Sequence, residues 1–304
     1  MQKKSATARL IPRTFSPREV ARALGMSEAS IKRWCDQGEF QLVKTRGGHR
    51  RIPLGSVLAH LRRSKLPLEQ AEALGLPASL SLKEAAPLPE TQRRVLEALE
   101  FGSYEALRDQ CWTQYLGGAS LCEICDGLLA PAFLMIGDRW SHGETEAYQE
   151  RRACELTLRL LNDLRWTVNP AKPEAPRAIG CTLEGDPYEL PTKMAELILL
   201  EKGWRAQSLG AGIPVHSIAR ALTREAPRLL WISVSTVNTV ESLRAAIDEL
   251  HDAATLKTCA LAIGGRALRD DLRKHLRYSF FGDGFVHLAA YADSLMAKGW
   301  RSRR

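Results

Sequence analysis

Two short helices separated by a tight turn are the feature of this sequence that most narrows what it can fold into. Ser16 is placed to cap a helix with Pro17 at its first position and Glu19 at its third, and this arrangement is a capping box. The helix should end at Gly25, after which Ser27 caps a second helix that ends at the next glycine. Helices joined in this way form a helix-turn-helix.

A hairpin is expected next. Residues 40–53 read as two extended runs around Gly47-Gly48, and residues 54–63 as a third helix. In a helix-turn-helix the second helix lies in the major groove of DNA. The outer face of that helix carries Ser30, Lys32 and Arg33, and the hairpin carries Arg46, His49, Arg50 and Arg51.

The charge of the chain is concentrated at this end. Residues 1–65 hold 15 Lys and Arg against four Asp and Glu, a net charge of +11, whereas the other 239 residues carry −3. A small basic segment suits phosphate binding, because each neutralised phosphate releases counterions. The sequence shows no apolar run long enough to span a bilayer and no secretory signal, so we expect a cytoplasmic protein without a membrane partner.

Residues 14–63 resemble the DNA-binding domain of the MerR family, whose wing typically reads Thr-x-Gly-Gly-x-Arg, here Thr45 to Arg50. The resemblance implies a winged helix-turn-helix domain over residues 1–65. It also implies that the recognition helix and the wing contact DNA through the seven side chains named above. Typical MerR regulators continue into a long dimerising helix, but residues 66–90 contain four prolines, which preclude one. We therefore predict a linker at 66–90 with one short helix, and dimerisation through the C-terminal part.

Helical periodicity interrupted by glycines predicts a four-helix bundle over residues 91–172. Cys122 and Cys125 form a lone C-x-x-C pair, for which no second pair exists, so no metal site is expected. Within the bundle, Trp140 and Glu150 have the spacing of the W-x9-E-H motif. This stretch is similar to the helical cap over cobalamin in the CarH/LitR light-responsive repressors, although Arg151 takes the His position.

From residue 173 to 304 strands and helices alternate, which predicts a Rossmann-like doubly wound parallel sheet. The expected strands are 178–183, 205–209, 229–234, 259–263 and 278–281. Asp186, Ser233, Gly264 and Gly265 have the spacing of the D-x-H-x-x-G, S-x-L and G-G motifs of cobalamin-binding domains. The resemblance to the CarH/LitR type thus covers nearly the whole chain and implies a multidomain fold.

The first of these motifs departs from the family. Tyr188 stands where the cobalt-ligating His is expected, and Pro191 replaces the Gly. A phenol must lose its proton to ligate a metal, so His-on cobalamin ligation cannot occur at residue 188. Three readings remain open: a domain that has lost its tetrapyrrole, a haem site with Tyr188 or His142 as iron ligand, or cobalamin held without the lower His. The candidate cofactor-binding residues are Trp140, Glu150, Asp186, Tyr188, Ser233, Gly264 and Gly265.

The function expected from these features is a DNA-binding transcriptional regulator, and the resemblance implies a repressor. Its partners would be operator DNA, further copies of the chain in a homodimer or higher oligomer, and an antagonist protein as one option for the signal. The alternative class is a corrinoid-dependent methyltransferase-like module, against which the missing His and the basic head argue. The sequence offers no catalytic constellation, so an enzyme is not expected.

Overall fold

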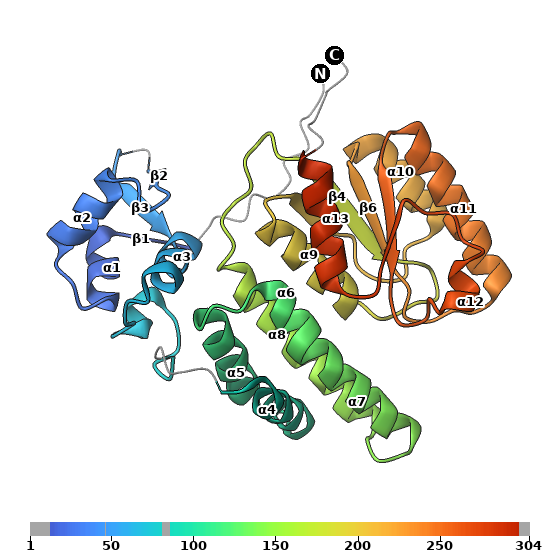
Figure 1. Cartoon of the computed structure of the whole chain (residues 1–304), viewed down its shortest axis with the longest axis horizontal. Coiled ribbons are helices and arrows are strands. Elements are labelled where there is room, and N and C mark those ends of the chain that lie inside the picture. The colour runs from blue at the N-terminus through green and yellow to red at the C-terminus, as the bar shows by residue number, and fades with distance from the viewer. Residues whose placement is uncertain (1–12, 46, 81–85, 298–304) are drawn as a thin grey trace. The chain divides into compact units, whose positions relative to one another are not determined.

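The computed structural model describes residues 13–45, 47–80 and 86–297, and the chain divides into two compact units (Figure 1). The first unit holds the described residues up to 80 together with 163–170. The second holds 86–162 and 171–297. Arg46 and the expected linker residues 81–85 lie outside the described residues.

The first unit is built on the predicted helix-turn-helix. Ser16 caps α1 (Pro17–Ala23) in a complete capping box with Glu19, and Ser27 caps α2 (Glu28–Asp36). A small antiparallel sheet of order β1-β3-β2 follows, and α3 (Leu54–Ser64) comes directly after it. Its strands are β1 (Thr14–Phe15), β2 (Val43–Lys44) and β3 (Arg50–Pro53). The winged helix-turn-helix fold is thus confirmed.

The segment after α3 packs into the same unit. A 3-10 helix, Ala71–Leu74, lies against α1, and the backbone N–H groups of Glu69 and Gln70 donate to the carbonyl of Ala23. Four leucines of this segment are buried: Leu68, Leu74, Leu76 and Leu80. The short helix expected in the linker is therefore present, and residues 68–80 pack into the core of the head.

Four helical segments follow in the second unit. They are α4 (Leu88–Phe101), α5 (Tyr104–Leu116), the continuous run α6 (Leu121–Ile124), a π-helical turn (Cys125–Leu129) and α7 (Ala130–Ser141), and finally α8 (Ala147–Arg165). The breaks fall at glycines in the left-handed backbone conformation, such as Gly102 and Gly143, as helix ends favour. The predicted bundle of four helices is confirmed.

The rest of the second unit is a five-stranded sheet of order β5-β4-β6-β7-β8, parallel throughout. Its strands lie within two residues of the predicted ends: β4 (Arg177–Thr182), β5 (Arg205–Ser208), β6 (Leu229–Ser233), β7 (Ala260–Gly264) and β8 (Phe280–Gly282). The strand order reverses direction between β4 and β6, and doubly wound sheets bind ligands beyond the carboxyl ends at such a point. The Rossmann-like fold is confirmed.

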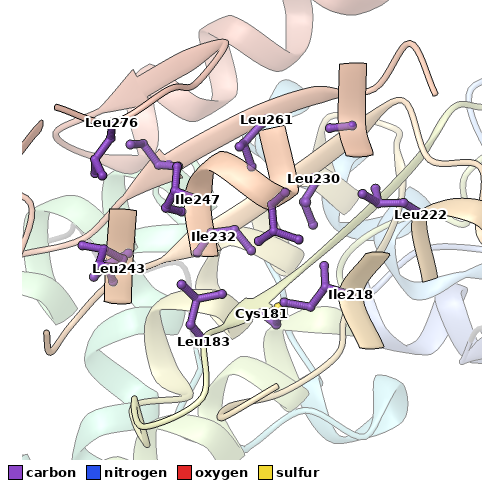
Figure 2. Packing of buried hydrophobic residues seen from close by; sticks show 14 of the residues in the cluster. Cys181, Leu183, Ile218, Leu222, Leu230, Ile232, Leu243, Ile247, Leu261 and Leu276 are labelled. Atoms are coloured by element: carbon purple, nitrogen blue, oxygen red, sulfur yellow. The ribbon is translucent and has the colours of Figure 1, made fainter. Parts of the chain in front are cut away.

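Helices cover both faces of this sheet (Figure 1). On one face, Ile232 and Leu261 pack against Ile218 of α10 (Val215–Glu225) and Leu243 and Ile247 of α11 (Val240–Leu256) (Figure 2). The other face packs against α9 (Leu190–Glu201) and α13 (Phe285–Ala297). The short α12 (Asp270–Arg273) precedes β8. Across the described part of the chain, the helices are too short or too polar to cross a bilayer.

Candidate DNA interface and cofactor-like site

The outer face of α2 carries the residues expected to enter the major groove. Arg33 is exposed, and its guanidinium has no partner among the described residues. Lys32 is also exposed and pairs with Glu28 one turn earlier, Nζ to Oε1 2.8 Å. Ser30 is half-buried, and its hydroxyl lies 2.9 Å from that of the capping Ser27. The α2 face therefore presents two cations to DNA: Arg33, and Lys32, whose exposed ion pair with Glu28 is weak enough to be replaced by a phosphate.

The wing places a second cation beside this helix. In the β2–β3 hairpin Lys44 pairs with Arg50 in register, and Gly48 takes a left-handed conformation at the turn, with φ 76°. The guanidinium of Arg50 reaches Asp36 at the end of α2, Nη1 to Oδ1 2.6 Å. Both side chains of this pair are solvent-exposed, and His49 is exposed next to them. The pair sets the wing tip against the recognition helix.

Arg51 has a different role from its neighbour. Its Nη2 donates to the carbonyl of Thr14 at 2.9 Å, and its Nη1 lies 3.4 Å from the carboxylate of Glu19. The same carboxylate accepts the backbone N–H of Ser16, which chiefly holds the pKa of Glu19 below its usual value, with Arg51 adding to the effect. Arg51 thus joins β3 to the capped start of α1 and positions the wing.

Sequence reasoning missed three exposed cations on the same unit. Arg18 and Arg22 are one turn apart on the exposed side of α1, and Lys44 is exposed on β2. The helical spacing of the two arginines was the available signal, because residues at i and i+4 share one helix face. Together with Arg33 and Arg50 they enlarge the basic surface of the head.

The motif residues of the C-terminal domain meet at the carboxyl ends of three strands. The register sets Thr182, Ser233 and Gly264 side by side on β4, β6 and β7. Gly265 follows with φ 120°, and a Cβ added there would lie 2.3 Å from the carbonyl oxygen of Val234. Only glycine suits this position. The motif spacing therefore reflects a real juxtaposition in the fold.

Asp186 is buried and is fully used by the backbone around it. Its Oδ1 accepts the N–H of Tyr188 at 3.1 Å, and its Oδ2 accepts those of Ser235 at 2.6 Å and Thr236 at 3.3 Å. The carboxylate thus ties the loop after β4 to the loop after β6. This function needs no ligand, which explains how Asp can persist in the motif when the His does not.

The two positions at which the family has a His contact each other in this chain. The guanidinium carbon of Arg151, on α8, lies 5.9 Å from the ring centroid of Tyr188, in the loop before α9. This is a cation–π contact between the cap helix and the motif loop. Pro191 lies in the first turn of α9, and its fixed φ makes this end of the motif stiffer than the glycine of the family pattern. These residues do not fit a His-ligated cobalamin.

The other residues predicted to bind a cofactor have contacts of their own. Trp140 is exposed over 56% of its surface, and the carboxylate of Glu150 contacts Cys154 and Arg151 on its own helix. His142, the other candidate iron ligand, is exposed at the end of α7, where Nδ1 lies 2.8 Å from the carbonyl of Asp138. Their roles in cofactor binding stay predictions.

The surroundings of Cys111 and Cys122 in the bundle disfavour the thiolate form. Burial raises the pKa of Cys111 to about 12, and burial together with Asp126 raises that of Cys122 to about 12. A thiol is nucleophilic or metal-binding only as the thiolate. No cluster of three or more His, Cys, Asp and Glu side chains capable of holding a metal occurs in the described residues.

Comparison with known proteins agrees with both halves of this description. Residues 14–65 match the family described as Helix-turn-helix domain. Over 269 residues the chain is 24% identical to the HTH-type transcriptional repressor CarA of Myxococcus xanthus, covering 86% of this chain and 89% of that protein. The monomethylamine corrinoid protein of Methanosarcina barkeri has a similar fold, with a TM-score of 0.59, 16% identity, and coverage of 69% of this chain and 100% of that one.

The two folds define the class: a helix-turn-helix transcription regulator with a cobalamin-binding-like C-terminal domain. More narrowly, the chain resembles a MerR regulator of the CarH/LitR type over most of its length. Tyr188 replaces the expected cobalt ligand.

Proposed function

We propose that this protein is a transcriptional repressor that binds operator DNA as a homo-oligomer and is not an enzyme. The observation that carries the proposal is the pairing of recognition helix and wing, in which Arg33 and Arg50 face outward from one basic unit. The similarity to a repressor named CarA supports the direction of regulation.

The head offers two kinds of contact with DNA. Arg33 has its full set of N–H donors available for a base edge, where arginine commonly binds guanine. Lys32, His49 and Arg50 are suited to phosphates, because an exposed ion pair such as Arg50–Asp36 gives up little free energy when a phosphate replaces the carboxylate. Arg51 contributes by positioning the wing.

The C-terminal region would set how many heads act together. Helices α4 and α7 pack on each other and expose large apolar side chains, namely Phe101 at 81%, Leu134 at 57% and Met135 at 47%. Exposed apolar residues of this kind favour association between copies. Two linked heads on adjacent half-sites gain affinity through effective concentration.

One helix belongs to both units. Helix α8 carries Glu150 and Arg151 near its start, and its last residues are part of the head unit. In the head, the backbone that follows it packs on Gly55 of α3, where an added Cβ would lie 2.2 Å from the carbonyl oxygen of Thr167. Helix α8 thus connects the cap to the DNA-binding unit along the chain.

The test is a binding measurement on the full chain with a duplex recovered from a random library. Arg33→Ala should weaken binding by about 1–3 kcal/mol and relax the preference at one base pair. Arg50→Ala should reduce the slope of log K against log salt by about 1. The exposed Arg224, in the last turn of α10, provides a matched control whose replacement by Ala should change neither value.

If Arg33→Ala and Arg50→Ala both keep the affinity and the salt slope of the natural chain, the DNA-binding surface is elsewhere. Oligomerisation is tested separately by sedimentation. Phe101→Ser and Leu134→Ser should each shift the chain toward the monomer and lower its affinity for operator DNA. If the natural chain itself sediments as a monomer, the proposed oligomer is wrong.

A further inference from the structure

We propose that Trp231 is a built-in plug that occupies the slot where a corrinoid-binding domain of this fold receives the nucleotide tail, so that the C-terminal domain works without a tetrapyrrole. The inference deepens the proposed function and relies on it for the regulatory role of that domain. It accounts for the loss of the His ligand as one part of a larger change.

The position of Trp231 follows from the alternation of β6. Side chains two residues apart point to the same face of a strand, so Trp231 shares a face with Ser233, the motif serine at the carboxyl end. This is the face covered by α9 and α13. Trp231 is 3% exposed and Ser233 is 7% exposed. The indole therefore fills the space directly beneath the motif serine.

The neighbouring strand leaves room for the indole. Gly180 on β4 is in register with Trp231, and a Cβ added at Gly180 would lie 2.0 Å from the Cδ2 atom of the ring. Further small residues, Ala178, Ala195 and Ala262, belong to the same buried cluster. A flat bicyclic ring is thus accommodated between sheet and helix by residues that lack bulk.

A hydrogen bond fixes the ring. The Nε1 of Trp231 donates to Oγ1 of Thr192 at 2.9 Å, and that hydroxyl lies 3.3 Å from Oγ of Ser208 on β5. Thr192 is fully buried in the first turn of α9, immediately after the 186–191 motif. The indole is therefore tightly packed and its N–H is hydrogen-bonded. Displacing the ring would remove a hydrogen-bond partner of the buried Thr192 hydroxyl.

The contact between Tyr188 and Arg151 occupies the space in which a corrin ring would lie. In the family that the chain resembles, the two positions lie on either side of the corrin ring, and here their side chains meet at 5.9 Å. Cobalamin's nucleotide ends in a benzimidazole, a bicyclic aromatic heterocycle of the same size as indole. Since close-packed interiors hold one such ring in one space, Trp231 and the tail exclude each other.

The first experiment attempts to restore binding. Hydroxocobalamin is added to the full chain, and bound corrin is followed by visible absorption after gel filtration. The natural chain and the Tyr188→His/Pro191→Gly variant should elute without corrin, whereas adding Trp231→Gly to that variant should give stoichiometric binding. Stoichiometric binding by the natural chain, or equal binding by the double and triple variants, would overturn the proposal.

The second experiment does not depend on rebuilding the whole site. Trp231→Ala should leave a cavity that benzimidazole can enter, so that this compound raises the melting temperature of the variant by several degrees through binding to the folded state. A matched control is Trp204→Ala, because Trp204 is fully buried in the same cluster and its Nε1 has no hydrogen-bond partner among the described residues. Benzimidazole should not stabilise that variant or the natural chain.

Absence of any benzimidazole effect on Trp231→Ala, or an equal effect on Trp204→Ala, would show that the Trp231 site is not a slot for such a ring. Operator binding is measured on the same samples. If the natural chain does not bind DNA, the proposed function is wrong but the assignment of the Trp231 slot still holds. Failure of the proposed function and failure of the slot assignment therefore give different results.

Discussion

The DNA-binding head and the C-terminal domain treat their family motifs in different ways. In the head, the residues that build the fold and the residues that would contact DNA are both retained, from the capping box at Ser16 to the exposed Arg33 and Arg50. In the C-terminal domain, Asp186 and Gly265 have the expected spacing, but Tyr188 and Pro191 stand where the resemblance implies a His and a Gly.

The difference separates two meanings of a motif. Asp186 holds two loops together, and Gly265 permits a close approach to the backbone of Val234, so the fold itself needs both. Tyr188 and Trp231 have backbone conformations that other side chains can adopt, so their identities report on the ligand space, although Trp231 also packs in the core. The spacing of a motif therefore identifies the fold of a domain, whereas the residues in the binding space identify its chemistry.

The largest expected effect tests whether Trp231 is part of the core. Trp231→Ala should lower the free energy of unfolding by about 3–5 kcal/mol, because it removes a fully packed indole and leaves a cavity. The same change at Trp140, which is 56% exposed, should cost under about 1 kcal/mol. Urea unfolding of the full chain followed by circular dichroism measures both. Similar costs at the two sites would mean that the Trp231 slot is not filled as described.

The next effect sharpens the comparison within the head. Arg51→Ala should destabilise it by about 1.5–3 kcal/mol, since charged hydrogen bonds to Thr14 and Glu19 are lost. Arg50→Ala should cost about 0–1 kcal/mol, because its pair with Asp36 is exposed. Melting curves of the two variants decide between the roles. If Arg50→Ala proves the more damaging, the division between a positioning and a binding arginine is wrong.

Much of this architecture could be predicted from local signals. Caps at Ser16 and Ser27, left-handed glycines at helix ends, and apolar strands recurring between helices each depend on a few consecutive residues. The five strands of the sheet were placed within two residues for that reason. Motif spacing then indicated which strand ends meet, and the register of β4, β6 and β7 agrees.

The rest depends on contacts between residues far apart in the chain. Arg51 remains a predicted DNA contact, but its additional hydrogen bond to Thr14 spans 37 positions and has no local signal in the sequence. The four prolines between residues 66 and 90 predict that no long helix forms there, but they do not show whether the segment is buried. The packing of residues 68–80 against α1 therefore could not be predicted. Trp231 was overlooked, although a Trp two residues before the motif Ser233 was a visible signal. Its meaning required the pairing with Gly180.

The smallest expected effect concerns the pH dependence of the head. Burial, chiefly, and the cation of Arg63 hold the pKa of His60 below its usual 6.5, and Glu39 opposes the shift. The ring packs against both Trp34 and Phe40, with centroids 4.8 and 5.0 Å away. Because the unfolded chain then binds more protons than the folded one, stability should decline as the pH falls through 6.5 and level off below the folded-state pKa. His60→Gln should flatten the melting temperature between pH 7 and pH 5, whereas a profile as steep as that of the natural chain would assign the acid sensitivity to another group.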